Sequence, residues 1–413
     1  MIKLIVLASV GLLLEGCETR KASVASIDNA KEKNAKHIVS ESNKTRRDTE
    51  DSFFITRSKA SKLSDDDIFM DEVIPEVQEI VPIMPGRTCN GMRIGIYSWD
   101  QRNWADESSD LVRYLNGPFA HSLTCGDVYV NVADYSSADS IPAADRIVPF
   151  IKNVRASGNS AIVWLTYGDV TQRNTTAVLT FINTFKRWMD SVSRDDAALI
   201  APVGISFDIE NFPAAVFKQV LLRSQGLKQD SVFGQDGLLV GCTIEGQYKP
   251  VDTDIIMKYA DRALMMAYRN YISKPGDMSG EGNGLIKLMR FMFTKQCPKC
   301  LDDAYARANY KAKVTVMFET ACKLGASCSY ISFCAYDGAG KTGGIDYFVS
   351  TVLKLDALLV SSGLMTAAQK DRLIAKDTPY AVHHWEWFDC FFGTSKNSIC
   401  GEYHSMANTC RKS

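Results

Sequence analysis

Apolar and polar positions follow two alternating patterns along most of the chain after residue 89. Short apolar runs rich in β-branched and aromatic residues recur, and stretches of helix length separate most of them. The stretch 177–189 has the clearest helical pattern, with apolar residues at three- and four-residue spacing. We predict strands at eight runs: 92–98, 127–132, 161–167, 203–209, 238–244, 263–268, 313–318 and 330–335.

Strand and helix in eightfold succession predict an α/β fold, the (β/α)8 TIM barrel. Two intervals are less regular. The interval 271–312 between the sixth and seventh strands is long, and the interval after the seventh strand leaves room only for a very short or irregular helix. A doubly wound open sheet is the alternative fold, but no Gly-x-Gly-x-x-Gly follows an early strand. We expect the tail that includes 380–392 to pack over the barrel.

The start of the chain has a pattern of its own. A short basic start leads into an apolar run from Leu4 to Leu14, which ends near Gly16 and Cys17. This is the pattern of a secretory signal peptide over 1–17, because a membrane span needs about 20 apolar residues. An uncleaved anchor, or a lipid on Cys17, is the alternative and would tether the N-terminus to a membrane. We therefore predict a secreted or extracellular protein.

Residues 18–88 differ in composition from the rest of the chain. They are rich in Lys, Ser, Asp, Asn and Glu and contain few aromatic residues. Such a segment cannot bury enough apolar surface to fold, which predicts a disordered tether or pro-segment. The barrel is then expected over 89–413, with a Cys-rich extension at its C-terminal end.

Twelve cysteines are present, of which eleven follow Cys17. Together with a signal peptide they predict disulfides, and the Cys297-Pro-Lys-Cys300 spacing is expected to form one. A zinc site that also uses Cys322 and Cys328 is the alternative. We expect neither a metal nor a cofactor. The formal net charge of -1 gives no basic field for nucleic acid, which excludes it as an expected partner.

The run 203–209 gives the clearest chemical signal. Side chains alternate across a strand, so one face is apolar and the other holds Gly204, Ser206, Asp208 and Glu210. The polar face should point into the barrel and put Glu210 at the C-terminal rim, where barrel enzymes keep their active sites. Two close buried carboxylates tend to share one proton, as a general acid for a glycosidic oxygen requires. Neutralisation by a floor Arg or Lys is the alternative.

The segment Asp208-Ile-Glu210 resembles the end of the family 18 chitinase signature, in which Asp, Asp and Glu alternate after a Gly. Gly204 matches that Gly, and Ser206 replaces the middle Asp. The resemblance implies that Glu210 protonates the leaving oxygen and that Asp208 orients the acetamido group of an N-acetylated sugar.

A second motif of that family is similar to Met266-Ala-Tyr268 at the sixth predicted strand, where Tyr268 would complete the acetamido site. Arg269 stands where the family has Asp. We include Tyr268 among the catalytic candidates and Arg269 among the substrate-binding ones.

Glu319 after the seventh strand, taken with Glu210, resembles the large retaining glycosidase clan, whose first Glu is acid/base and whose second is the nucleophile. In the chitinase-like alternative Glu319 supports or binds the substrate. The closest resemblance is to uncharacterised secreted barrel proteins of glycosidase type, which share Asp208-Ile-Glu210, Met266-Ala-Tyr-Arg269 and Glu319-Thr320. That likeness brings no known activity with it.

Further residues near strand ends are candidates for sugar binding. Glu245 and Asp169 are acids at the expected rim, and aromatic rings can stack on sugar faces; Trp99, Tyr97 and Tyr336 are the candidates chosen. We expect His383 and His384 to be satisfied surface or packing residues rather than ligands.

These patterns predict a secreted barrel that cleaves glycosidic bonds of a carbohydrate substrate, with Glu210 as general acid/base. The alternative is a catalytically inactive barrel that binds a glycan or a protein at the cell surface, which Ser206 and Arg269 favour. Metal-assisted hydrolysis of an amide or ester is disfavoured, because no clear His ligands are present.

Overall fold

A computed structural model describes residues 93–100, 102–106, 111–112, 115, 126–156, 161–245, 248–267, 284–320 and 344–383. The predicted signal peptide 1–17, the predicted tether 18–88 and the cysteines after residue 384 lie outside the described residues. Those assignments stay predictions.

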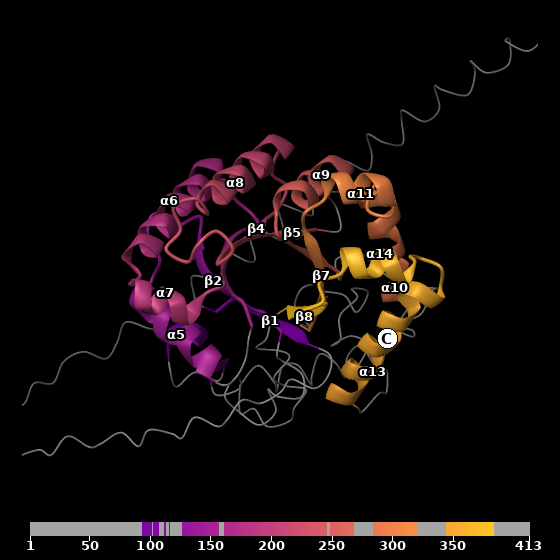
Figure 1. Ribbon diagram of the computed structural model, residues 1–413, viewed down its shortest axis with the longest axis horizontal. Coiled ribbons are helices and arrows are strands. Elements are labelled where there is room, and N and C mark those ends of the chain that lie inside the picture. Colours follow the sequence, from indigo (N-terminus) through magenta and orange to yellow (C-terminus); the bar gives the residue numbers. More distant parts are fainter. Residues whose placement is uncertain are drawn as a thin grey trace, which may run out of the picture. The chain divides into compact units, whose positions relative to one another are not determined.

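Eight parallel strands close into a barrel in chain order, which confirms the predicted fold (Figure 1). They are β1 (Ile94–Ser98), β2 (Val128–Asp134), β3 (Val163–Asp169), β4 (Val203–Ile209), β5 (Leu238–Ile244), β6 (Arg262–Met266), β7 (Lys313–Glu319) and β8 (Tyr380–His383). Because all strands run the same way, their carboxyl ends meet at one rim of the barrel.

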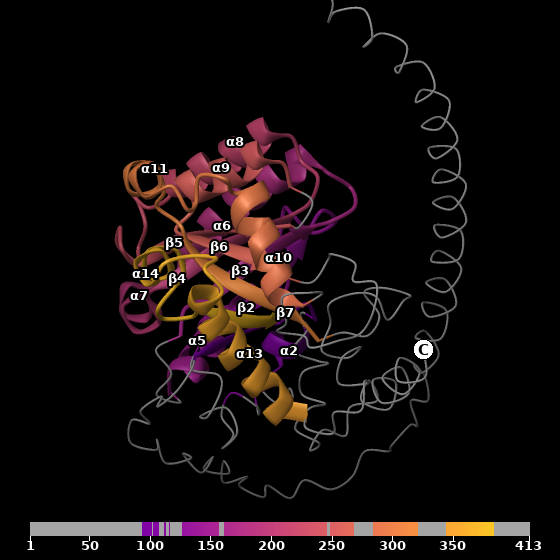
Figure 2. The same cartoon turned by 90° about the vertical axis from the view of Figure 1, so that its right-hand side faces the viewer.

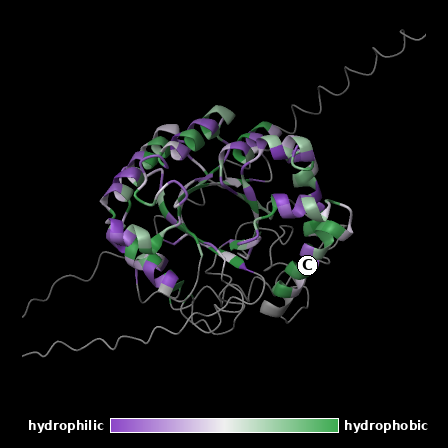
Figure 3. Cartoon of the chain, viewed as in Figure 1, coloured by the Kyte–Doolittle hydropathy of each residue, from purple (hydrophilic) through white to green (hydrophobic). Residues whose placement is uncertain are grey.

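The described helices lie around this barrel (Figure 1). Each side of the ring carries both hydrophobic and hydrophilic residues, as amphipathic helices require (Figure 3). They are α2 (Arg102–Ala105), α5 (Ala144–Ala156), α6 (Thr175–Ser191), α7 (Arg194–Ile200), α8 (Ala214–Gly226), α9 (Pro250–Tyr259), α10 (Leu285–Phe291), the π-helix η1 (Met292–Gln296), α11 (Asp303–Asn309), α13 (Gly344–Ser361) and α14 (Ala367–Leu373).

The eighth strand is not the predicted one. β8 pairs with β1 through Ile94 and Tyr380 and with β7 through Glu319 and His383, which closes the barrel. The prediction of the eighth strand at 330–335 is therefore wrong, and that run lies outside the described residues. The expectation that 380–383 packs over the barrel is wrong for the same reason.

The connections on either side of β7 differ from their predicted lengths. Because β8 begins at Tyr380, the connection after β7 holds α13 and α14, and the expectation of a very short helix there is wrong. The long interval before β7 holds α10, η1 and α11. In the turned view α10 and α13 lie near each other on the side of the barrel that carries β7 (Figure 2). Arg290 of α10 donates a hydrogen bond to the carbonyl of Ser362, directly after α13, at 3.3 Å.

The sheet of the barrel separates two apolar clusters, one between the sheet and the helices and one inside the barrel. On β4, Ile205, Phe207 and Ile209 belong to the core between the sheet and the helices, as the alternation predicts. The interior holds a second cluster, which consists of Tyr97, Tyr129, Ile162, Trp164, Leu264, Met266, Met317 and Ala381. Trp164 lies so close to Gly204 that a Cβ there would be 2.1 Å from its ring. Only glycine fits this interior position of β4.

Directly after η1, Cys297 and Cys300 form a disulfide, which confirms the prediction for this spacing. Both sulfurs belong to the buried core. Cys242 on β5 is a buried free thiol, and burial raises its pKa. Within the ranges that the structure describes, no helix combines the length and the apolar character that a bilayer span requires.

Candidate functional site

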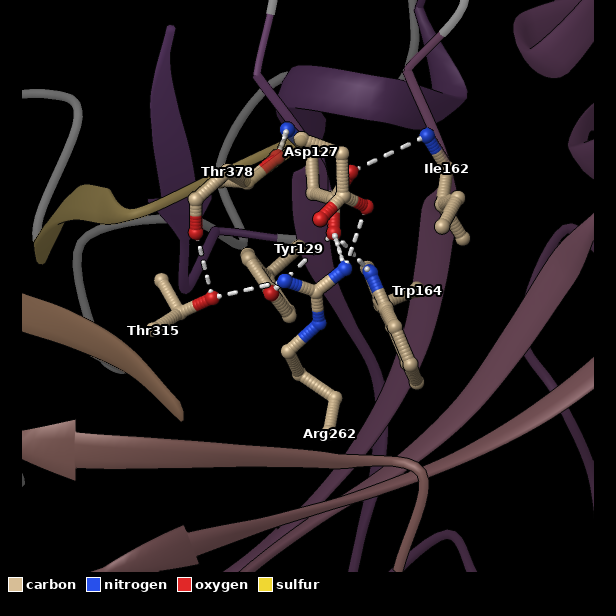
Figure 4. Close-up of polar contacts among 8 residues, drawn as sticks. Asp127, Tyr129, Ile162, Trp164, Arg262, Thr315 and Thr378 are labelled. Atoms are coloured by element: carbon tan, nitrogen blue, oxygen red, sulfur yellow. Dashed lines mark hydrogen bonds and ion pairs between the residues drawn. The ribbon is translucent and has the colours of Figure 1, made fainter. Parts of the chain in front are cut away.

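The amino ends of the strands carry an ion-pair network around the buried Arg262 (Figure 4). Arg262, at the start of β6, lies 3.4 Å from the Asp127 carboxylate and 2.5 Å from that of Asp377. It also donates to the Thr315 hydroxyl at 3.1 Å, and Thr315 in turn donates to the Thr378 carbonyl at 2.7 Å. We call this cluster the floor. Its arginine is engaged far from the carboxyl ends of the strands, so it does not neutralise Asp208 and Glu210.

The floor also fixes the interior packing. The Asp127 carboxylate accepts from the Trp164 indole at 2.9 Å and from the Ile162 backbone N–H at 3.3 Å. Burial raises the pKa of Asp127 and outweighs the opposing effect of Arg262. Burial would lower the pKa of Arg262, but Asp127 and the other neighbouring acidic groups raise it.

At the opposite end, β4 and β5 bring three carboxylates to the inner rim. Asp208, Glu210 and Glu245 are buried, with exposures of 0%, 3% and 2%. The Thr243 hydroxyl on β5 donates to Asp208 Oδ1 at 3.0 Å. Thr243 and Glu245 share the inward parity of β5, so the fifth strand adds its own acid beside the two acids of β4.

Tyr248 packs beside this acidic group from the connection between β5 and α9. Its hydroxyl donates to the Ile209 carbonyl, and it is buried. Burial raises its pKa, and the nearby acidic groups Cys242, Asp208, Glu245 and Glu210 raise it further, so the phenol stays a neutral donor. Gln296 of η1 donates to the Glu245 carbonyl at 3.0 Å and thereby supports the same connection.

A second polar group joins β7, β8 and β1 at the rim. Glu319 and His383 are 1% and 2% exposed, and His383 Nδ1 lies 2.7 Å from Glu319 Oε2. Glu319 Oε1 accepts from the Thr320 backbone N–H at 2.8 Å. On the other side of the imidazole, the Trp99 indole N–H donates to His383 Nε2. The carboxylate, the imidazole and the indole therefore form one hydrogen-bonded chain.

Tyr97 of β1 lies between the acids of β4 and the hydrogen-bonded chain of Trp99, His383 and Glu319. The charge of Asp208, after burial, raises its pKa, which places its phenol near the acids of β4. Its ring centroid is also 5.3 Å from that of His383 and 5.0 Å from that of Trp99. The acids of β4 and the Glu319 chain thus face the same interior.

The structure brings together six of the predicted site residues at this rim: Glu210, Asp208, Glu319, Glu245, Tyr97 and Trp99. Tyr268, Arg269 and Tyr336 lie outside the described residues. Asp169, which we predicted as a rim acid, accepts from the backbone N–H groups of Gln172, Arg173 and Asn174 and caps the loop before α6.

His383 is the residue that sequence reasoning assigned to surface or packing. It is buried and hydrogen-bonded, but its partners are Trp99 and Glu319 of the site. The alternation of Tyr380, Ala381, Val382 and His383 could have pointed to it, because the last residue of an inward-facing series on a barrel strand lies at the rim. In the part of the chain that the structure describes, no three His, Cys, Asp or Glu side chains are grouped to hold a metal ion.

No family model matches the chain, and no curated protein matches it. Solved structures of the same barrel type are similar at low identity. Concanavalin B has a TM-score of 0.42 and 12% identity, over 78% of this chain and 100% of that chain. The catalytic domain of a family GH18 chitinase from the fern Peteris ryukyuensis has a TM-score of 0.40 and 12% identity, over 77% and 100%.

The spore cortex-lytic enzyme SleL of Bacillus cereus has a TM-score of 0.34 and 11% identity, over 55% of this chain. The match spans about half of that enzyme, 51% of its chain. The fold thus resembles that of GH18 glycosidases and related barrels.

Proposed function

We propose that this protein hydrolyses glycosidic bonds, with Glu210 as general acid/base. The observation that carries the proposal is the presence of Glu210 and Glu319, both buried, at the inner carboxyl rim of one barrel. Glycosidases use a pair of carboxyl groups on either side of the scissile bond, of which one holds a proton and the other is ionised. The chemistry of the rim fits that division of roles.

Two routes share this acid. In the retaining route Glu210 protonates the leaving oxygen while Glu319 attacks the anomeric carbon, and water then releases the sugar with Glu210 as base. In the substrate-assisted route the acetamido oxygen of an N-acetylated sugar is the nucleophile. Asp208 would orient that group and Tyr268 would complete its site.

The aromatic and polar neighbours are proposed to bind the sugar. Trp99 is half-buried at the end of β1 and has its ring fixed by His383, so it can offer a flat face for stacking. Tyr97 and Glu245 line the same interior, and we assign Arg269 and Tyr336 to substrate binding from the sequence. The partner is then a carbohydrate outside the cell, with secretion or an N-terminal tether proposed from the sequence alone.

The test is the release of reducing ends from a panel of soluble glycans that includes chitin oligosaccharides. Glu210→Gln preserves the shape of the side chain and removes the acid, so the rate on a responsive glycan should fall by about 10²- to 10⁴-fold. Thermal unfolding should be unchanged. Equal turnover by the wild type and the variant would overturn the proposal.

Glu319→Gln separates the two routes. In the retaining route the variant loses its nucleophile and turnover falls as far as in Glu210→Gln. In the substrate-assisted route only glycans with an acetamido group are hydrolysed, and Glu319→Gln retains measurable turnover of them.

A barrel that binds a glycan or protein without cleaving it is the second candidate. Ser206 favours it, because this buried hydroxyl on β4 occupies the position of the middle Asp of the chitinase signature. Binding on a glycan array without turnover of the bound glycan would support this second function over the first.

A further inference from the structure

We propose that His383 is a positioning residue that orients the Glu319 carboxylate and at the same time fixes the plane of Trp99. The reacting carboxylate and the sugar-stacking ring would then be held as one unit. This inference rests on the proposed function and deepens it, since it assigns Glu319 the ionised role. The observation behind it is the hydrogen-bonded chain from Trp99, directly after β1, through His383 of β8 to Glu319 of β7.

The chemistry of the indole gives this chain a direction. An indole N–H can only donate, so His383 Nε2 must be the accepting nitrogen and carries no proton. In a neutral imidazole the proton then resides on Nδ1, which donates to Glu319 Oε2 at 2.7 Å. Glu319 thereby receives a hydrogen bond on that oxygen, as an ionised carboxylate would.

Backbone contacts hold both partners in place. Glu319 Oε1 accepts from the Thr320 N–H at 2.8 Å, and the Thr320 hydroxyl donates to the His383 carbonyl at 2.7 Å. Glu319 and His383 also face each other in the register of β7 and β8. All three residues are buried, where a hydrogen bond is stronger than in water. The carboxylate plane is therefore fixed before a substrate binds.

The other end of the chain fixes the stacking ring. A Cβ at Gly168 of β3 would lie 2.8 Å from Trp99 Cζ3, so the indole reaches from β1 against the backbone of β3. Its edge meets the imidazole of His383 at an interplanar angle of 88°. The ring thus has a contact at one side and a directional hydrogen bond at the other, which leaves it little freedom to tilt.

Two variants of His383 separate the two functions of the imidazole. In His383→Asn the shorter amide can keep an N–H near the position of Nδ1 but has no atom near Nε2, so the bond to Glu319 is kept and the one to Trp99 is lost. In His383→Gln the longer amide can place its oxygen near Nε2, so the bond to Trp99 is kept and the donor to Glu319 is lost. The pair is matched in polarity and close in size.

We expect His383→Gln to lower kcat by about 10- to 100-fold with little change in KM, since one hydrogen bond to a buried charge is lost. His383→Asn should raise KM by about tenfold and keep kcat within a few-fold. If both variants merely lower the unfolding temperature, with kcat and KM unchanged for the folded fraction, His383 is a packing residue and the proposal is wrong.

A measurement that needs no substrate tests the same chain. The protein has five histidines, and the His383 signals in a ¹⁵N imidazole spectrum can be assigned by their loss in His383→Asn. The wild type should show the Nδ1-protonated tautomer, and Trp99→Phe, which keeps an aromatic ring without the N–H, should allow the Nε2-protonated form. A wild-type Nε2-protonated ring would overturn the proposal even if the glycans are cleaved. Lack of turnover with the expected tautomer would instead refute only the proposed hydrolysis.

Discussion

The two ends of this barrel handle buried charge in different ways. At the floor, Arg262 lies between Asp127 and Asp377 and also donates to the Thr315 hydroxyl. At the rim, the acids accept from neutral groups: the Thr243 hydroxyl, the Thr320 N–H and the His383 ring. An arginine thus lies between the two acids of the floor, whereas hydroxyl, amide and imidazole donors orient Asp208 and Glu319 at the rim.

This difference separates stability from chemistry. A carboxylate that contacts a buried guanidinium is held in that contact and is not available to attack a carbon. A carboxylate held by hydroxyl, amide or imidazole donors keeps its orientation and can still act as acid, base or nucleophile. Changes at the floor should therefore alter unfolding, and changes at the rim should alter turnover.

The largest effect on stability is expected from Arg262→Met. The change leaves Asp127 buried without its cation, and breaking a buried pair in this way costs about 3–5 kcal/mol. Adding Asp127→Asn should restore part of that loss, because the unpaired charge is then absent. Denaturant unfolding measures both. A loss below about 1 kcal/mol for Arg262→Met would show that the floor is not structural.

A smaller loss of stability is expected from Gly204→Ala, which tests whether the floor fixes the packing inside the barrel. The new methyl group would meet the Trp164 ring, whose indole is held by Asp127 at 2.9 Å. The ring cannot move without breaking that bond, so we expect a loss near the upper end of about 1–3 kcal/mol. Gly226→Ala on α8, where a Cβ meets nothing within 4 Å, is the matched control and should not destabilise the protein.

Asp261, just before β6, makes the stability of the amino end depend on pH. Burial would raise its pKa, but hydrogen bonds from Lys228, Lys311 and the Val240 N–H lower it below the usual value. A carboxylate with a lowered pKa stabilises the folded state above the unfolded pKa of about 4, and this contribution disappears as the pH falls through the folded value.

We therefore expect Asp261→Asn to cost about 2 kcal/mol at pH 7 and progressively less below pH ~4. Unfolding curves of both proteins across this range measure the difference. A difference that stays constant as the pH falls would contradict the assignment.

The smallest effect is expected beside the rim acid. Asn211 directly follows Glu210, is exposed and has a φ of 59°, in the left-handed region that Asn tolerates better than most residues. Asn211→Ala should cost about 1 kcal/mol, and Asn211→Gly should be neutral within about 0.5 kcal/mol. Thermal unfolding of the pair measures this, and equal stability of the two variants would show that the turn carries no strain.

The alternation of β4 was sufficient to predict its inward face and the place of Glu210, because strand parity is local. The eighth strand was not predictable in this way. The runs 330–335 and 380–383 are both short and apolar, and what selects the second is its pairing with β1 and β7. That pairing depends on residues far apart in the chain.

The role of His383 could not be predicted either, because its contacts also join residues far apart in the chain. Its contact with Glu319 follows from the register of β7 and β8, and its contact with Trp99 spans 284 positions of sequence. The floor could not be predicted from the sequence either. Asp127 and Arg262 lie at the starts of different strands that are far apart in the chain, and only the closed barrel brings their side chains within 3.4 Å.

The most direct test compares turnover at the two ends of the barrel on one responsive glycan, per mole of folded protein. Thr315→Val removes a floor hydroxyl that accepts from Arg262, and Glu210→Gln removes the rim acid. We expect the wild-type rate from Thr315→Val, with reduced stability, and a rate at least about 10²-fold lower from Glu210→Gln, with unchanged stability. A wild-type rate from Glu210→Gln would contradict the central claim that the chemistry belongs to the rim.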